Sequence, residues 1–235
     1  MDSINLYEKR IFSQNGEDGI LEELFSRIGT INRYFVEFGV QSGLECMAKN
    51  LVCSHHWSGV MIEGHPLNYQ HLRANYASFP NVITHYSFIT RENITEIFSQ
   101  LHVPREFDLL SIDIDGIDYW VWRELAAYKP RVVIMEYNAS FPPPLKMVVA
   151  YDPQFMWNGT TYFGASLTSL TELGKQLGYA LIGTDANGVN AFFIRQDLCE
   201  QSGFPSLTPE QAYHPPGYGQ KQSGHPQGSG PYLEI

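Results

Sequence analysis

The sequence predicts an α/β fold in which helices cover a mostly parallel sheet. Short apolar runs typical of buried strands alternate with segments whose apolar residues recur at helical spacing. One of these runs, Arg131-Val-Val-Ile-Met135, is apolar at every position after the first, as expected of a strand covered on both faces. Strands that alternate with helices join in parallel, so the two observations favour a single sheet with helices on both sides.

Six segments have the residue spacing of helices. The first begins at Glu17 and ends before Gly29, a residue that commonly stops a helix. Pro66 suits the first turn of the third helix, where its missing amide costs nothing. The predicted helices cover residues 17–28, 44–53, 66–76, 91–101, 119–128 and 166–177.

Seven short runs, rich in β-branched, aromatic and other apolar residues, are predicted as strands. They cover residues 34–38, 59–62, 82–85, 107–112, 131–135, 179–182 and 191–194. The last two are separated by the turn-forming stretch Asp185-Ala-Asn-Gly-Val-Asn190, so we expect them to form a β-hairpin.

The chain of 235 residues is long enough for one sizeable α/β domain, which we place at residues 1–198. Within it, residues 138–164 hold several prolines and aromatic residues without helical spacing, and a loop of this length is usually a lid or a binding loop. Residues 199–235 form a tail rich in Pro, Gly and His. We expect this tail to be irregular, with two roles left open, a lid and a contact in a homo-oligomer.

Charge and cysteine content limit the classes of partner. The net charge of −10, from 25 acids and 15 bases, disfavours nucleic acid and anionic membranes, both of which attract clustered Lys and Arg. Three cysteines without C-x-x-C spacing favour free thiols over disulfides or a zinc site. The first residues do not show the basic segment followed by an apolar stretch that is typical of a signal peptide, and no uncharged apolar run approaches the roughly 20 residues of a membrane span. We therefore expect a soluble, cytoplasmic protein that acts on a small molecule.

A cofactor site is predicted at the ends of the first two strands. The first strand leads through Glu37 into Gly39 and Gly43, and the second ends at Glu63. In a nucleotide-binding βαβ unit, a tight glycine turn follows the first strand and an acid after the second accepts hydrogen bonds from ribose hydroxyls. The pattern indicates a nucleoside-containing cofactor.

Further acids follow the fourth and fifth strands. Asp113 and Asp115 alternate along an extended chain and point to one side of it, and Glu136 and Asn138 follow the neighbouring strand. Oxygen donors of this kind suit a hard divalent cation such as Mg, Mn or Fe, for which Asp115, Glu136 and Asn138 are the candidate ligands. The alternative is that Asp115 or Asp118 caps the following helix.

With these residues placed, about the first 195 residues resemble a class I S-adenosylmethionine-dependent methyltransferase, most closely the FkbM-type branch. Five stretches carry the resemblance through their order and spacing. They are Phe12-Ser-Gln-Asn-Gly-Glu-Asp18, Phe35-Val-Glu-Phe-Gly39 with Gly43, Met61-Ile-Glu-Gly-His-Pro66, Leu109-Leu-Ser-Ile-Asp-Ile-Asp-Gly116, and Gly178-Tyr179 leading to Phe192-Phe193.

The resemblance implies a Rossmann-like sheet of seven strands in the order 3-2-1-4-5-7-6, with strand seven antiparallel. It also implies that S-adenosylmethionine is the cofactor and that its contacts come from acids and glycines at the strand ends. In such a family Glu37, Gly39 and Gly43 hold the methionine part, Glu63 the ribose, Gln14, Glu17 and Asp18 close over the cofactor, and Asp113 lies near the sulfonium.

Our hypothesis is methyl transfer to a hydroxyl of a small acceptor such as a sugar or a secondary metabolite. Asp113, Asp115 and Glu136 are the candidate catalytic groups, with or without a divalent metal. A second hypothesis keeps the fold without methyl transfer, as an enzyme of other chemistry or a metal- or ligand-binding partner subunit built on the acidic cluster. A third, a purely structural interaction module, is disfavoured because the acids converge at the strand ends.

Overall fold

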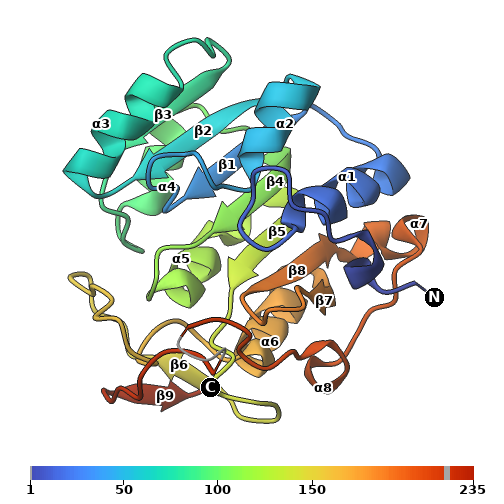
Figure 1. Ribbon diagram of the computed structural model, residues 1–235, viewed down its shortest axis with the longest axis vertical. Helices are drawn as coiled ribbons and strands as arrows, with labels where there is room; N and C mark the ends of the chain where they lie inside the picture. The colour runs from blue at the N-terminus through green and yellow to red at the C-terminus, as the bar shows by residue number, and fades with distance from the viewer. Residues whose placement is uncertain (1, 220–222) are drawn as a thin grey trace.

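The computed structural model describes residues 2–219 and 223–235. A seven-stranded sheet in the order β3-β2-β1-β4-β5-β8-β7 runs through its centre (Figure 1). Neighbouring strands pair in parallel, except that β8 is antiparallel to both β5 and β7. The strands of this sheet are β1 (Tyr34–Phe38), β2 (Ser58–Glu63), β3 (Val82–Tyr86), β4 (Glu106–Ile112), β5 (Lys129–Glu136), β7 (Tyr179–Thr184) and β8 (Asn190–Arg195).

The strand order confirms the predicted fold class. Since β6 lies outside this sheet, counting the sheet strands along the chain gives 3-2-1-4-5-7-6, with the seventh strand antiparallel. The expected hairpin of the last two strands is also confirmed, because β7 and β8 pair directly.

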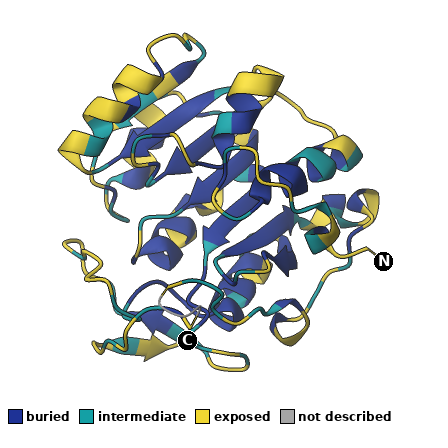
Figure 2. Cartoon of the chain, in the orientation of Figure 1, coloured by how far each residue is buried: buried dark blue, intermediate teal, exposed yellow. Residues whose placement is uncertain are grey.

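Helices cover both faces of the sheet. Successive strand residues point to opposite faces, so that Phe35 belongs to one core and Val36 to the other. One core packs against α1 (Glu17–Ile28), α2 (Ala48–His55) and α3 (Pro66–Asn75), and the other against α4 (Ile94–Gln100), α5 (Asp118–Glu124) and α6 (Leu167–Leu177). Figure 2 shows the buried strands between helices whose outer surfaces are exposed. This double covering explains why residues 131–135 are so apolar.

Three predicted helices are shorter than expected. Helix α2 begins at Ala48 instead of residue 44, because the Glu37 carboxylate accepts hydrogen bonds from the Met47 and Ala48 amides and fixes the start there. Helix α4 begins at Ile94, since residues 91–93 form a turn. Helix α5 ends at Glu124 and continues as the 3-10 turn η2 (Leu125–Ala127).

The long loop and the tail contain regular structure that the sequence analysis did not predict. Within 138–164, β6 (Met147–Val149) pairs antiparallel with β9 (Tyr232–Glu234) from the tail, below the main sheet in Figure 1. The expectation of an irregular tail is therefore wrong for β9, and also for two short helices; residues 220–222 of the tail lie outside the described residues. The remaining short elements are η1 (Ile4–Tyr7), η3 (Gln196–Leu198), α7 (Cys199–Ser202) and α8 (Pro209–Ala212).

A buried ion pair fixes the connection from α1 to β1. Asp108 on β4 accepts hydrogen bonds from the amides of residues 31–33 and pairs with Arg131 at 3.3 Å. Arg131 also donates to the carbonyl oxygens of residues 28 and 29 at the end of α1. Each buried charge thus has several partners, which is the condition for burying it. Within the described part of the chain, no helix has the length and apolar character needed to cross a membrane.

Candidate functional site

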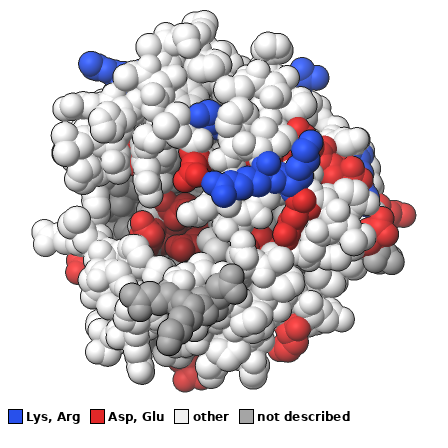
Figure 3. Space-filling view, in the orientation of Figure 1, with Lys and Arg blue, Asp and Glu red and all other residues white. Residues whose placement is uncertain are grey.

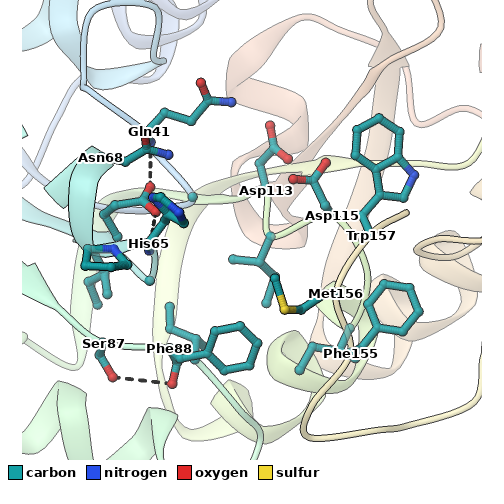
Figure 4. Close-up of a pocket in the computed structure, with 18 residues that line it drawn as sticks. Gln41, His65, Asn68, Ser87, Phe88, Asp113, Asp115, Phe155, Met156 and Trp157 are labelled. Carbon is teal, nitrogen blue, oxygen red and sulfur yellow. Dashed lines mark hydrogen bonds between the residues drawn. The ribbon is translucent and has the colours of Figure 1, made fainter. Parts of the chain in front are cut away.

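A cavity of about 480 Å³ opens at the carboxyl ends of β1, β2, β3 and β4. This is where open parallel sheets bind their ligands. Figure 3 shows Asp and Glu side chains gathered in a hollow on the face seen in Figure 1, and Figure 4 shows the cavity's lining. Four loops after strands and the 138–164 loop supply the lining, which comprises Gly39, Gln41, residues 62–66, Asn68, residues 87–89, 113–115 and 117, and residues 155–157.

Glu63 lies in this cavity as predicted. Its carboxylate is buried and accepts hydrogen bonds from the backbone amides of Gln41 and His65, both at 2.7 Å. A carboxylate offers about four acceptor positions, so about two remain for a ligand. Glu63 therefore ties together the loops after β1 and β2 and can still accept hydrogen bonds from a pair of hydroxyl groups.

Gly39 forms the corner between β1 and its loop. Its φ is +68°, and a Cβ at this position would lie 1.6 Å from the carbonyl oxygen of Asp113. Only glycine permits this approach, which brings the β1 loop and the segment after β4 together at the cavity wall.

Gly43 lies outside the cavity. Its carbonyl accepts a hydrogen bond from the Tyr76 hydroxyl at 2.8 Å, so this glycine packs on the end of α3 and does not line the cavity.

Glu37 also lies outside the cavity lining. Its two oxygens accept hydrogen bonds from the Met47 and Ala48 amides at 2.8 and 2.9 Å. Burial raises the pKa of Glu37 to about 7, and these hydrogen bonds oppose the shift. The structure thus uses this carboxylate to cap α2 and to order the loop that precedes it.

Gln14, Glu17 and Asp18 surround the start of α1 and do not line the cavity. Oδ2 of Asp18 accepts hydrogen bonds from the amides of residues 11–13 and from the Ser13 hydroxyl. The other oxygen, Oδ1, is buried and has no hydrogen-bond partner among the described residues. Glu17 accepts from Asn190 at 2.8 Å, whereas Gln14 is exposed.

Three of the predicted acids do come together. Asp113, Asp115 and Glu136 each place a carboxylate oxygen within 4.8 Å of the other two, and Figure 4 shows Asp113 and Asp115 on the same side of the chain. Asp118 does not join them. It accepts hydrogen bonds from the amides of Ile114 and Gly116 at 2.8 Å, so it orders the turn that precedes α5. The alternative in which Asp115 or Asp118 caps this helix is wrong, because Ile117 occupies the N-cap position and no side chain caps the helix.

The cluster holds its protons more tightly than ordinary carboxylates. Removal of water by surrounding atoms raises the pKa of Asp113 well above its usual value, and the Asp115 charge adds to the shift. Loss of water followed by repulsion from Asp118 raises the pKa of Asp115 to about 6. The pKa of Glu136 is also raised well above its usual value, by burial and then by Asp113. A bound cation would relieve this repulsion.

Asn138 has a different position from the one expected of a metal ligand. Its side-chain amide is fully buried and donates to the carbonyl oxygens of Thr161 and Phe163, both at 2.8 Å. Its oxygen accepts from the Ser140 amide at 3.1 Å. These bonds fasten the long loop to the end of β5. For this reason Asp113, and not Asn138, completes the set of candidate ligands.

Several lining residues were not singled out from the sequence. Gln41, Ser87 and Phe88 stand in loops after strands and Asn68 lies in the first turn of α3, where no residue pattern marks a contact. Residues 155–157 lie in the loop that the sequence predicts to bind a ligand, and the Phe155 ring lies against Gly116, where a Cβ would be 2.2 Å from it. The aromatic content of this loop is the sequence feature from which residues 155–157 could have been predicted to line the cavity.

Solved structures share this architecture. A Staphylococcus aureus protein named as a caffeoyl-CoA O-methyltransferase superposes with a TM-score of 0.51 at 14% sequence identity, covering 81% of this chain and 87% of that one. The chain has the class I methyltransferase fold. The N-terminal domain of EvdMO1 with SAH bound gives a TM-score of 0.49 at 15% identity, covering 78% of this chain and 80% of that one. No protein-family model and no curated protein matches the sequence.

Proposed function

We propose that this chain is an S-adenosylmethionine-dependent methyltransferase of the FkbM-type branch, acting on a hydroxyl of a small molecule such as a sugar or a secondary metabolite. The observation that carries the proposal is the cavity at the carboxyl ends of β1, β2 and β4, with Glu63 and the Gly39 corner in its wall. Ligands of this fold class bind at that edge of the sheet.

The residues fit the proposed cofactor. Two hydroxyls of a ribose can reach the unused acceptor positions of Glu63, and the cavity volume of about 480 Å³ lies in the range of small-molecule sites. The carboxylates of the cluster favour a sulfonium. When bound, S-adenosylmethionine supplies the methyl group. The protein holds the acceptor oxygen in line with it, and such positioning is a large share of catalysis.

A divalent metal also fits, at Asp113, Asp115 and Glu136. Three carboxylates within 4.8 Å of one another are hard oxygen donors of the kind that Mg or Mn prefers, and Fe is a further candidate. When bound, the metal would lower the pKa of an acceptor hydroxyl. A carboxylate of the cluster that is ionised at neutral pH, such as Asp115 with its pKa of about 6, can take the hydroxyl proton.

The cavity favours an uncharged acceptor with an apolar part. None of the described residues that line it is Lys or Arg, so apart from the His65 imidazole an anionic acceptor would find no side chain there that can carry a positive charge. Phe88 and Trp157 in the lining are 46% and 37% exposed, and Met156 is 75% exposed. These side chains leave apolar surface at the mouth that a ligand can cover.

The second candidate function is a metal- or ligand-binding member of the fold that does not transfer methyl groups. The acidic cluster favours this second function, because three carboxylates can bind a cation whether or not S-adenosylmethionine is bound nearby. Metal analysis of the purified protein separates the two proposals. Stoichiometric metal in a protein that does not bind S-adenosylmethionine supports the second.

The methyl-transfer proposal is tested with a panel of neutral sugars and polyols incubated with S-adenosylmethionine, with and without Mn²⁺. Mass spectrometry is expected to find a product heavier by one methylene group and a matching amount of S-adenosylhomocysteine. The Asp113→Asn variant is expected to lose this product, and the Asp152→Asn variant, altered at an exposed acid, is expected to keep it. Product formation by the Asp113→Asn variant at the wild-type rate would remove the cluster from the mechanism.

A further inference from the structure

A second cavity of about 410 Å³ lies between the long loop and the C-terminal tail. It shares no lining residue with the cavity at the strand ends. Residues of the loop, Ser140, Phe141 and Thr161, face residues 227–230 and Tyr232 of the tail across it. Nothing in the proposed methyl transfer uses this cavity.

The walls of this second cavity are built by specific contacts. The Tyr232 hydroxyl donates to the carbonyl oxygen of Thr161 at 2.9 Å, and the Gly228 amide donates to the Thr161 hydroxyl at 3.0 Å. The rings of Phe141 and Tyr232 meet edge to face with centroids 5.1 Å apart. Strands β6 and β9 pair beside them. The cavity is therefore held open by the same bonds that join the tail to the loop.

Two glycines make this approach of the tail feasible. A Cβ on Gly228 would lie 2.0 Å from the Thr160 hydroxyl, and a Cβ on Gly230 would lie 2.2 Å from the Tyr162 ring. Larger residues at these positions would push the tail away from the loop and open the cavity to bulk water. The close fit of the two segments thus depends on these glycines.

The lining has the chemistry of a site for neutral hydroxylated ligands. It includes no Asp, Glu, Lys, Arg or His among the described residues that form it. Ser140, Gln227 and Ser229 are among the lining residues, and their side chains form no hydrogen bond with the rest of the described chain. Hydroxyl and amide groups can both donate to and accept from sugar hydroxyls, and the rings of Phe141 and Tyr232 can pack against the apolar face of a sugar.

We propose that the second cavity binds a neutral saccharide through Ser140, Gln227 and Ser229, with Phe141 and Tyr232 as the apolar wall. A phosphorylated or carboxylated sugar is excluded, because its charge would lose water without gaining a cationic partner. Binding here does not require S-adenosylmethionine and does not rest on methyl transfer.

The segment between the two cavities connects them. Trp157 lines the first cavity, and its indole N–H donates to the carbonyl oxygen of Thr160 at 2.7 Å, next to Thr161 in the second. Of the four tryptophans, Trp157 alone is substantially exposed, at 37%, whereas the others are at most 6% exposed. A saccharide in the second cavity is thus expected to change the tryptophan emission.

Saturation-transfer NMR on the full chain tests the proposal, with methyl glucoside, methyl galactoside, maltose and cellobiose as neutral probes and glucose 6-phosphate and glucuronic acid as charged ones. At least one neutral probe is expected to bind, and neither charged probe is expected to bind. The double variant Gln227→Ala/Ser229→Ala is expected to bind at least about fivefold more weakly, the loss typical of one hydrogen bond. Both positions are exposed, so the variant is expected to fold normally.

The matched control is Gln70→Ala, which removes an exposed carboxamide from α3 without touching the cavity. Its affinity is expected to equal that of the wild type. Tryptophan emission is a second readout, and its response is expected to vanish in Trp157→Phe while the NMR signal remains. Absence of binding by all four neutral probes, unchanged affinity in the double variant, or equal binding of the charged probes would each overturn the proposal.

Discussion

Replacing Asp113 by Asn is expected to stabilise the protein while it removes a functional group. The carboxylates of Asp113, Asp115 and Glu136 approach within 4.8 Å, and burial followed by mutual repulsion raises the pKa of Asp113. Asn has nearly the same shape and no charge. The variant therefore measures the repulsion between Asp113 and the other two carboxylates. If Asp113 instead formed an ion pair with a cationic group, the same change would remove an attraction and destabilise the protein.

The size of the effect follows from Coulomb's law. Two unit charges 4.8 Å apart repel by about 3.5 kcal/mol at an effective dielectric constant of about 20, and by about 1 kcal/mol in water. Asp113 is half-buried, so we expect a gain of about 1 to 3 kcal/mol in the free energy of unfolding. For a chain of this size that raises Tm by about 2 to 12 °C.

The pH at which the gain appears is set by the direction of the pKa shifts. When folding raises the pKa of a carboxyl group, the stability that this group contributes is fully present below its pKa in the unfolded chain. That stability is lost as the pH rises through its pKa in the folded protein. Asp115, with a pKa of about 6, marks this range. The Tm of the Asp113→Asn variant should therefore exceed that of the wild type at pH 8 and approach it near pH 4.

Differential scanning calorimetry of the metal-free proteins at the two pH values measures this difference, with the exposed-site variant Asp152→Asn as the control. Repetition with Mn²⁺ is expected to raise the Tm of the wild type at pH 8 and to leave that of the Asp113→Asn variant unchanged. A lower Tm for the Asp113→Asn variant at pH 8 would show that Asp113 stabilises the fold, and the reasoning about repulsion would be refuted.

Three further predictions concern other acids. Glu63→Ala should weaken S-adenosylmethionine binding at least about tenfold in calorimetric titration, as expected for lost hydrogen bonds to a charged group, with an unchanged circular dichroism spectrum. The control Glu172→Ala, on the exposed side of α6, should bind S-adenosylmethionine as the wild type does. If Glu63→Ala bound it with wild-type affinity as well, Glu63 would not be part of the site. Asp108→Ala leaves the buried Arg131 without its carboxylate, so it should cost about 3 to 5 kcal/mol in urea unfolding and leave cofactor affinity at low temperature intact. Mn²⁺ affinity should rise about tenfold from pH 5 to pH 7, because Asp115 must lose its proton near pH 6; a flat profile would exclude it as a ligand.

The strands and their order could be predicted because local signals and chain topology agree. The apolar run at 131–135 reflects a strand covered on both faces, and regular alternation of strands and helices leaves few arrangements. The start of α2 could not be predicted in the same way. It depends on Glu37, ten residues away in sequence, whose carboxylate reaches the Met47 and Ala48 amides only in the folded chain.

The pairing of β6 with β9 was missed for a similar reason. Each strand has three residues, too few to show a period, and the partners Met147 and Glu234 are far apart in sequence. The tail is ordered there by contacts with the loop, and neither segment carries a pattern of its own.

The candidate site was predictable where it depends on sheet topology. Glu63 and Asp113 end parallel strands, and the carboxyl ends of parallel strands meet at one edge. The roles of Glu37 and Asn138 could not be predicted, because an acid or amide at the end of a strand can bind backbone amides and carbonyls as readily as a ligand. Only the folded structure distinguishes these uses.

The central claim is that the cavity beside Glu63 binds S-adenosylmethionine, and isothermal titration of the metal-free protein tests it most directly. S-adenosylmethionine and S-adenosylhomocysteine would each be titrated, without metal and then with Mg²⁺ or Mn²⁺. Micromolar binding of both is the expected result. Absence of binding by either compound under every condition would contradict the methyltransferase proposal and favour the metal- or ligand-binding alternative.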